Sequence, residues 1–304
     1  MSQLHSNELS VDEALVRRLL ASQFPEYAGL TLQPLGATGS SNVQFRLGNE
    51  WLVRLPRQPG GGDSLIKEQV WGSYIGEHLP VAVPWVLAIG KPEFGYREPW
   101  TLVRWLPGQH PVPGSPSPAV AKQLAELNRA FAQIEVPSEA RQDKSLARHY
   151  RGRALADYDS YFRKNLEDCR QIKDLQLDLD KALDIWESAI NLPHVNESRT
   201  RSTWFHGDLV AENLLVEDGQ ITGLLDLGGL GIGDPTIDLH GIWELLDASG
   251  REAFRQHLAI DDATWLRGRA WALAVALMTF PYYWHTMPGR ICDRLVMAEA
   301  ALSG

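Results

Sequence analysis

The sequence predicts an α+β protein with a small β-rich N-terminal lobe, residues 1–105, and a larger, mainly helical C-terminal lobe, residues 106–304. Three observations support this class. Apolar and polar residues alternate in 43–47 and 51–55 around Gly48-Asn49, which predicts a strand pair with a tight turn. Five prolines between Pro107 and Pro118 exclude a helix or central strand there and mark the boundary. Beyond them, helical periodicity dominates.

The first lobe is expected to contain two helices besides the strand pair. Ser10 and Glu13 form a capping box before leucines at helical spacing, which predicts a helix of about a dozen residues. Residues 65–79 predict a second helix after three consecutive glycines. A Gly-Ser-rich segment, 36–42, precedes the first strand of the pair, and residues 100–106 predict a further buried strand.

The second lobe is expected to be helical with one buried hairpin. Apolar residues between 120 and 134 recur at alternating steps of four and three, which predicts a long amphipathic helix. Helical patterns also cover 147–168 and 176–190 and return after Asp238. Between them, two apolar runs within 213–226 flank Asp218-Gly219, a strong hairpin signal.

The composition excludes several classes of protein. With 44% hydrophobic and 22% charged residues, the chain is not mainly disordered. A net charge of −9 argues against a dedicated nucleic-acid binder. The cysteines, Cys169 and Cys292, stand far apart, so we expect neither a disulfide framework nor a thiolate zinc site, and we expect a cytoplasmic protein. The most apolar run, 270–284, is shorter than the ~20 residues of a membrane span, so it predicts a buried helix.

The residues most informative for chemistry lie around the predicted hairpin. Asp208 and Asn213 precede its first strand and Asp226 ends its second, so the hairpin brings these side chains toward one end of the sheet. Two carboxylates and an amide oxygen suit Mg²⁺ together with substrate phosphates. A carboxylate beside them can accept a proton from an attacking hydroxyl. Taken singly, each residue is equally well explained as a turn former or helix cap.

The motif as a whole is more specific. It reads His206-Gly-Asp208-Leu-x3-Asn213-Leu-Leu, then Leu-Leu-Asp226, then Gly-Asp234-Pro-x2-Asp238-Leu. This pattern resembles the aminoglycoside phosphotransferase (APH) family, small-molecule kinases that share the bilobal protein-kinase-like fold. The lobe order also agrees, so the resemblance covers nearly the whole chain.

The resemblance implies a role for each residue of the motif. Asp208 corresponds to the catalytic base that orients and deprotonates the acceptor hydroxyl. Asn213 and Asp226 correspond to the two ligands of Mg²⁺. The remaining residues correspond to supports of the catalytic loop, and they are His206, Asp234 and Asp238.

By the same resemblance, the first lobe binds the phosphoryl donor, ATP or GTP. The segment containing Ser40, Ser41 and Asn42 resembles the loop that covers the phosphates, where backbone amides and short hydroxyls contact phosphate oxygens. The strand over 100–106 resembles the hinge, whose backbone at Arg104, Trp105 and Leu106 would receive the base.

A cation on the donor phosphates is also implied. Arg54 occupies the position of the family's strand lysine, and Glu68 on the following helix is its expected ion-pair partner, ahead of Glu77. Arginine departs from the family pattern, because a guanidinium is a planar fork and not a compact point charge.

The acceptor is expected to be a small molecule, most simply a cationic antibiotic such as an aminoglycoside. The family recognises aminoglycosides with acids of the large lobe, and residues 106–304 carry 28 acidic and 20 basic residues, against ten and nine in 1–105. A macrolide, or a choline-like amine or amino alcohol, is the alternative, since eleven tryptophans could line an apolar pocket. We expect a monomer or weak dimer without nucleic-acid or membrane partners. Each candidate acceptor residue is, taken alone, better explained as a solvated helix charge, and the candidates are Asp157, Asp159, Glu244 and Asp247.

Other classes compete with this interpretation. The glycines of 228–233 do not meet the spacing of a dinucleotide-binding fingerprint. The short step from Asp226 to Asp234 leaves little room for a protein-kinase activation loop. A metal-dependent phosphoesterase could use Asp208, Asn213, Asp226 and His206 around two metal ions. A non-catalytic nucleotide-binding pseudokinase is the third possibility, which the arginine at position 54 favours and the joint presence of Asp208, Asn213 and Asp226 opposes.

Overall fold

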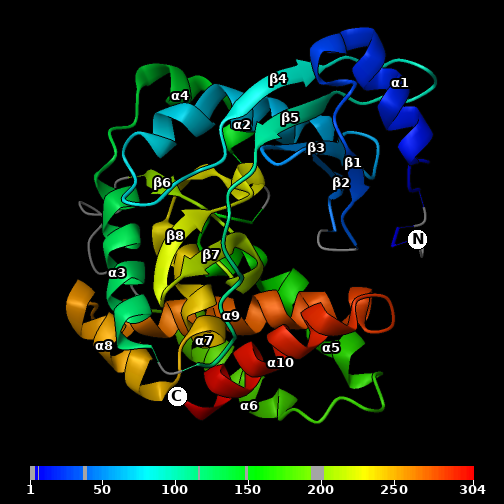
Figure 1. Cartoon of the computed structure of the whole chain (residues 1–304). Coiled ribbons are helices and arrows are strands. Elements are labelled where there is room, and N and C mark those ends of the chain that lie inside the picture. The colour runs from blue at the N-terminus through cyan, green and yellow to red at the C-terminus, as the bar shows by residue number, and fades with distance from the viewer. Residues whose placement is uncertain (1–3, 6, 37–39, 116, 148–149, 193–201) are drawn as a thin grey trace. The chain divides into compact units, whose positions relative to one another are not determined.

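The protein was analysed as a computed structural model that describes residues 4–5, 7–36, 40–115, 117–147, 150–192 and 202–304. It has an α+β fold that divides into two compact units (Figure 1). The first unit comprises Met1–Glu77 and Ala82–Pro107, and the second comprises His78–Val81 and Gly108–Gly304.

The first unit is built on a five-stranded antiparallel sheet in the order β1-β2-β3-β5-β4. The predicted strand pair is confirmed as β2 and β3, with Leu47 opposite Trp51 across the turn. Alternate residues face opposite sides of the sheet, so Val53 and Leu55 enter the hydrophobic core while Arg54 lies on the other face. The strands are β1 Leu32–Pro34, β2 Asn42–Leu47, β3 Trp51–Pro56, β4 Val86–Gly90 and β5 Trp100–Arg104.

Two helices complete this unit. Helix α1, Glu13–Gln23, buries its leucines against the sheet, and it is followed by the short 3-10 turn η1, Pro25–Tyr27. The predicted helix is confirmed, but the capping box at Ser10 is wrong. The N-cap is Asp12, whose carboxylate accepts a hydrogen bond from the Leu15 N–H at 2.7 Å. The helix expected over 65–79 is α2, Gly62–Gly76, which begins and ends three residues earlier than predicted, at the last of the three glycines.

The second unit is mainly helical and contains two small sheets among its described residues. The predicted hairpin is confirmed as β7, Leu214–Glu217, and β8, Gln220–Leu224. Asp218 and Gly219 both have positive φ, 50° and 74°, the backbone that a two-residue hairpin turn requires. A second pair, β6 (Thr203–Phe205) with β9 (Gly231–Gly233), was not predicted, because three-residue strands leave no alternation to detect.

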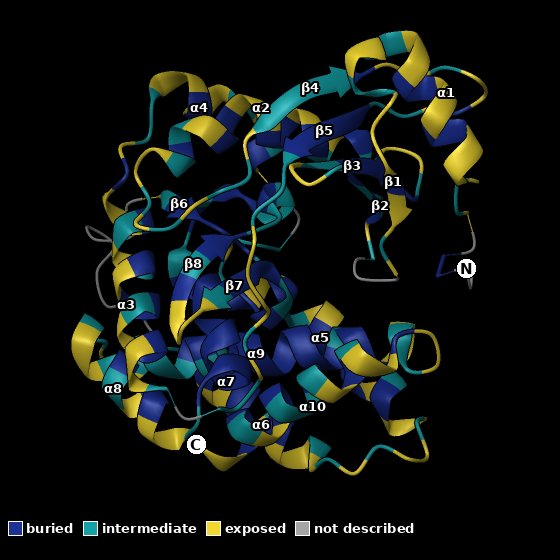
Figure 2. Ribbon diagram, viewed as in Figure 1, coloured by how far each residue is buried: buried dark blue, intermediate teal, exposed yellow. Residues whose placement is uncertain are grey.

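Helices α5, α6 and α10 and the 3-10 turn η6 pack against α9, whose residues are buried along most of its length (Figure 2). The buried helix expected over 270–284 is therefore confirmed as part of α9, and no described helix is long and apolar enough to cross a membrane. The helices are α3 Pro118–Gln133, α4 Ser138–Gln142, α5 Asp159–Arg170, α6 Leu179–Ile190, α7 Ile242–Leu245, α8 Ala248–Leu258, α9 Asp262–Tyr283 and α10 Pro288–Ser303. The 3-10 turns are η2 Lys144–Leu146, η3 Leu155–Tyr158, η4 Ala211–Asn213, η5 Leu227–Gly229 and η6 Pro235–Gly241.

Candidate active site

The loop from His206 to Asn213, here called the catalytic loop, joins β6 to β7, and Asp238 anchors its start. The Asp238 carboxylate in η6 accepts hydrogen bonds from the backbone N–H groups of His206 at 2.7 Å and Gly207 at 2.6 Å. Gly207 has a φ of +83°, and a Cβ on it would lie 2.6 Å from the Gly229 carbonyl oxygen, so the turn requires glycine. Asp238 thus holds the backbone that carries Asp208.

His206 is completely buried and uses both ring nitrogens within the protein. Its Nδ1 accepts a hydrogen bond from the Asp208 N–H at 3.2 Å, so Nε2 carries the proton and donates to the Leu225 carbonyl at 3.0 Å. The ring therefore links the catalytic loop to the residue before Asp226. Because both nitrogens are engaged, the structure does not support His206 as a metal ligand of a phosphoesterase.

Asp234 has a local role at the start of η6. Its carboxylate accepts from the N–H and the hydroxyl of Thr236, at 2.9 and 2.5 Å, and so caps the turn that carries Asp238. Its own N–H donates to the Gly152 carbonyl at 2.9 Å. Asp234 thus supports the catalytic loop indirectly, through the turn that carries Asp238.

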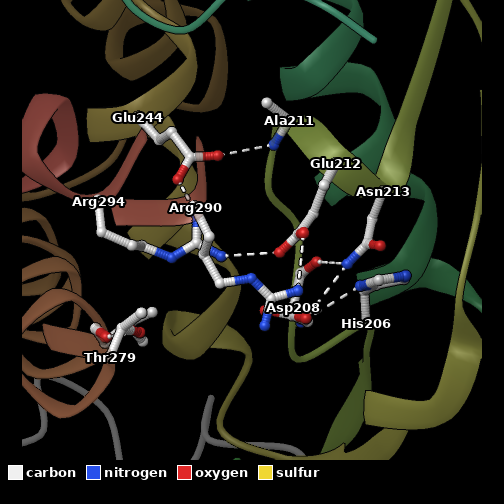
Figure 3. Close-up of polar contacts among 10 residues, drawn as sticks. His206, Asp208, Ala211, Glu212, Asn213, Glu244, Thr279, Arg290 and Arg294 are labelled. Atoms are coloured by element: carbon white, nitrogen blue, oxygen red, sulfur yellow. Dashed lines mark hydrogen bonds and ion pairs between the residues drawn. The ribbon is translucent and has the colours of Figure 1, made fainter. Parts of the chain in front are cut away.

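The structure brings together Asp208, Asn213 and Asp226. The Asn213 Nδ2 donates to the Asp208 Oδ2 at 3.2 Å and to the Asp208 carbonyl at 2.8 Å (Figure 3). The hairpin holds Asp226 nearby, because the Leu225 N–H donates to the Asn213 carbonyl at 2.8 Å. Asp226 itself has a φ of 55°, a conformation that is costly outside glycine and is concentrated at functional sites.

The donor atoms at this end of the hairpin fit Mg²⁺. The amide nitrogen of Asn213 is directed at Asp208, so its amide oxygen is directed away and, with the Asp226 carboxylate, supplies hard donors. In the part of the chain that the structure describes, no three His, Cys, Asp or Glu side chains gather around a metal position. A magnesium ion here would therefore complete its coordination with water and substrate phosphates, as is usual for this ion.

The surroundings of Asp208 keep its carboxyl group ionised. Burial alone raises its pKa, but the guanidinium groups of Arg151 and Arg294 outweigh burial, and the pKa lies below the usual range. Arg151 is fixed beside the loop, because its Nε donates to the Gly207 carbonyl at 2.6 Å. The position of Asp208 beside these two cations thus favours its carboxylate form.

A network of four charged side chains holds the other end of the catalytic loop (Figure 3). The two oxygens of Glu212 accept from Arg290 at 2.8 Å and from Arg294 at 3.0 Å. Glu244 on α7 accepts from Arg294 and, at 2.8 Å, from the backbone N–H of Ala211. The motif does not include the two arginines of this network. Their only signal in the sequence is the i, i+4 spacing that puts both on one face of α10.

A model of the phosphotransferase enzyme family, APH, matches residues 31–271 of the chain. The chain belongs to this family. It has no significant match among curated protein sequences. The family match shows that the recognised motif is part of a phosphotransferase.

Solved structures of phosphotransferases share the fold along almost the whole chain. The GDP and kanamycin complex of APH(2")-IIIa is 22% identical, with a TM-score of 0.71 over 96% of this chain and 99% of that one. The GDP complex of wild-type aminoglycoside 2'-phosphotransferase-IIIa is 19% identical, with a TM-score of 0.73 over 96% and 99%. Macrolide 2'-phosphotransferase MphH from Brachybacterium faecium is 21% identical, with a TM-score of 0.60 over 95% and 98%. The predicted kinase-like α+β fold is thus confirmed.

The first unit of this phosphotransferase contains the expected ion pair. Arg54 on β3 and Glu68 on α2 form two hydrogen bonds, at 2.5 and 3.1 Å, and both side chains are buried. Glu77 follows the end of α2 as its C-cap residue. The two-bond fork fixes the guanidinium plane, a geometry that lysine cannot provide.

The proposed phosphate loop is described only at its exit, since residues 37–39 lie outside the described part. The Ser40 carbonyl accepts from the His5 ring at 2.8 Å and the Ser41 carbonyl from the Arg57 N–H at 2.9 Å. Asn42, the first residue of β2, is buried. These contacts place the loop exit beside the N-terminal segment.

The hinge differs in part from the expectation for base binding. The Arg104 N–H donates to the Trp85 carbonyl at 3.0 Å, and the Trp105 N–H donates to the Glu50 carbonyl at 2.8 Å. The structure therefore does not support these two N–H groups as donors to a nucleotide base, because sheet bonds already occupy them. Leu106, which follows β5, stays a prediction as a contact for the base.

Three of the four predicted acceptor acids have structural partners instead. Glu244 is fully buried in the charged network, and Asp247 is the N-cap of α8, accepting from the Gly250 N–H at 2.7 Å. Asp159 accepts from Trp186 Nε1 at 2.8 Å and pairs with Arg163. The structure does not support these three as acceptor ligands, whereas Asp157 is exposed on η3.

Proposed function

We propose that this phosphotransferase moves the γ-phosphoryl group of ATP or GTP to a hydroxyl group of a small molecule. Residues 1–105 would bind the nucleotide, and residues 106–304 would supply the catalytic groups and bind the acceptor. One observation carries the proposal. The Asp208 carboxylate accepts a hydrogen bond from Asn213 on a loop that the hairpin joins to Asp226.

Each residue has a defined part in this reaction. Asp208 accepts the proton of the acceptor hydroxyl as that oxygen attacks the γ-phosphorus and the bond to the β-phosphate oxygen breaks. Asn213 and Asp226 would hold Mg²⁺, which when bound neutralises charge on the donor phosphates. The Arg54 fork, oriented by Glu68, would contact the same phosphates. By donating to Asp208 Oδ2, the Asn213 amide would also orient the carboxylate toward the proton of the acceptor hydroxyl.

Aminoglycosides are the first candidate acceptors. The structural neighbour solved with kanamycin supports this class, and so does the excess of acidic residues in 106–304. Macrolides are the second candidate, supported by two observations: three predicted acids are engaged elsewhere, and Tyr161, which is 62% exposed, stacks on Tyr158 with 5.5 Å between ring centroids. Such an aromatic surface suits apolar and sugar-bearing molecules.

The decisive experiment replaces Asp208 by Asn, which keeps the shape and removes the base. We expect kcat to fall by roughly 10³-fold while the Kd for the Mg-nucleotide stays within about twofold, because the base acts only in transfer. The matched control is Asp218→Asn in the hairpin turn, where Asn also tolerates positive φ. Normal turnover in Asp208→Asn would refute the assigned base.

An acceptor screen separates the competing classes. Mg-ATP and Mg-GTP would be offered with aminoglycosides, macrolides and amino alcohols, and products read by the mass of one added phosphoryl group. Nucleotide binding without transfer to any acceptor would favour a pseudokinase. Phosphate release from esters without nucleotide would favour a phosphoesterase.

A further inference from the structure

The segment before α1 closes over the exit of the proposed phosphate loop within the first unit. Leu4 and His5 are buried, at 7% and 6% exposure, although they precede all helices and strands. The His5 Nε2 lies 2.8 Å from the Ser40 carbonyl oxygen, 35 residues further along the chain. A carbonyl oxygen only accepts, so Nε2 carries a proton and donates.

An ion pair between the buried Arg57 and the half-buried Glu8 fastens the same segment to the end of β3. The Glu8 carboxylate accepts from the Arg57 guanidinium at 2.8 Å and from the Leu4 N–H at 3.0 Å. The Leu9 N–H donates to the Arg57 carbonyl at 2.6 Å. Arg57 in turn reaches the loop, because its N–H donates to the Ser41 carbonyl at 2.9 Å.

These bonds fix the orientation of the loop's peptide groups. A trans peptide is planar, so its carbonyl and the next N–H point in opposite directions. With the Ser40 carbonyl turned to His5, the Ser41 N–H is turned away from the N-terminal segment. Backbone N–H groups of such loops are what bind phosphate oxygens. The ion pair with Arg57 also offsets the negative charge of Glu8, which would otherwise repel the donor phosphates.

We propose that His5, Glu8 and Arg57 form a clasp that positions the Ser40–Ser41 backbone, at the exit of the phosphate loop, for the nucleotide donor. This inference rests on the proposed function, since it assumes that the loop binds donor phosphates. The three are positioning residues: they act through the Ser40–Ser41 backbone and do not touch the acceptor chemistry. The clasp predicts that donor affinity, and not the chemical step, depends on the N-terminal segment.

The test uses the full-length chain with His5→Ala, Glu8→Gln and the conservative variant His5→Gln, whose amide can still donate to the Ser40 carbonyl. The matched control is Asn7→Ala, which removes an exposed hydrogen bond to Gln58 in the same segment. We expect His5→Ala and Glu8→Gln to raise the Kd for Mg-ATP or Mg-GTP about tenfold, the equivalent of about 1.4 kcal/mol. His5→Gln and Asn7→Ala should stay within about twofold of the native chain.

Two further readouts separate positioning from loss of folding. The KM for nucleotide should rise while kcat and the acceptor KM stay unchanged. Hydrogen exchange at the Leu9 and Arg57 amides, which donate the backbone bonds of the clasp, should accelerate in nucleotide-free His5→Ala, with the exchange of α9 unchanged. A native Kd in a folded His5→Ala would overturn the clasp alone. A native chain that binds neither nucleotide would overturn the proposed function, and with it the donor role of the clasp.

Discussion

The two units each bury charged side chains, but they arrange them differently. In the first unit, Arg54 and Glu68 form an ion pair with two hydrogen bonds between a strand and a helix. In the second unit, two arginines and two glutamates are linked through the catalytic loop, and each of the four carboxylate oxygens has a donor. The pair links one strand to one helix, whereas the network links three segments of the second unit: the catalytic loop, α7 and α10.

This difference separates two uses of buried charge. Placing an ion pair in the interior costs desolvation, so the pair seldom adds much stability for its own sake. A single fork aimed from the sheet is useful if an anionic ligand joins it. A network in which every carboxylate oxygen has a donor is useful for holding a loop, because moving the loop would leave several buried charges without partners at once. The first arrangement therefore suits ligand binding, and the second suits rigidity around Asp208.

The largest effect is expected from breaking the network. Arg294→Met removes the side chain that joins Glu212 to Glu244 and leaves the fully buried Glu244 without its guanidinium partner. We expect the free energy of unfolding to fall by roughly 3–5 kcal/mol, the usual cost of stranding a buried charge. Urea denaturation at pH 7 measures it.

The control for this variant is Arg163→Met on α5. Arg163 also bridges two carboxylates, those of Asp159 and Glu187, but it is 43% exposed. Its loss should cost less than about 1 kcal/mol, because water screens exposed pairs. Equal losses in the two variants would show that the network has no special role.

The contrast also explains what the sequence could predict. The motif residues Asp208, Asn213 and Asp226 are within reach of local reasoning, because one hairpin with a clear turn signal brings them together. Arg54 and Glu68 were predictable for a similar reason, since a strand and the next helix carry them. Local periodicity and turn chemistry predicted the strand, the helix and the hairpin, and the resemblance to the family supplied the pairing of Arg54 with Glu68.

The network could not be placed in this way. Glu212 and Arg294 are 82 residues apart, and only tertiary packing brings them together. Glu244 was predicted to be an acceptor-binding residue, but it is buried on a four-residue helix. A helix this short gives no periodicity that could distinguish its buried side from its exposed side. The prediction of the α1 N-cap was wrong for a different reason. Ser10 and Asp12 are both good capping residues, and only the backbone geometry decides between them.

The second-largest effect is expected from pH, through the buried His240 in η6 of the second unit. Burial lowers the pKa of His240 to about 4, so this residue is neutral in the folded state near pH 7. The unfolded chain takes up the proton first, near its ordinary pKa of about 6.5. Stability is therefore full above pH 6.5 and falls as the pH drops toward 4, by about 3 kcal/mol in total.

Urea denaturation at a series of pH values measures this loss. His240→Gln should remove the His240 contribution to the slope between pH 6.5 and 4. His257→Gln, at an exposed position on α8, should leave the slope unchanged. A slope that persists in His240→Gln would show that other groups cause the acid sensitivity.

The smallest change is expected on the first unit's side, from Arg54→Lys. Lysine keeps the charge but loses the two-bond fork to Glu68, so we expect unfolding to become easier by only about 1 kcal/mol. The KM for nucleotide should nevertheless rise about tenfold, since the fork orients the cation for the phosphates. Arg17→Lys, in an exposed pair on α1, is the control. If Arg54→Lys left the nucleotide KM unchanged, Arg54 would be a structural ion pair like those of the network, and the division between a ligand-binding pair and a loop-holding network would fail.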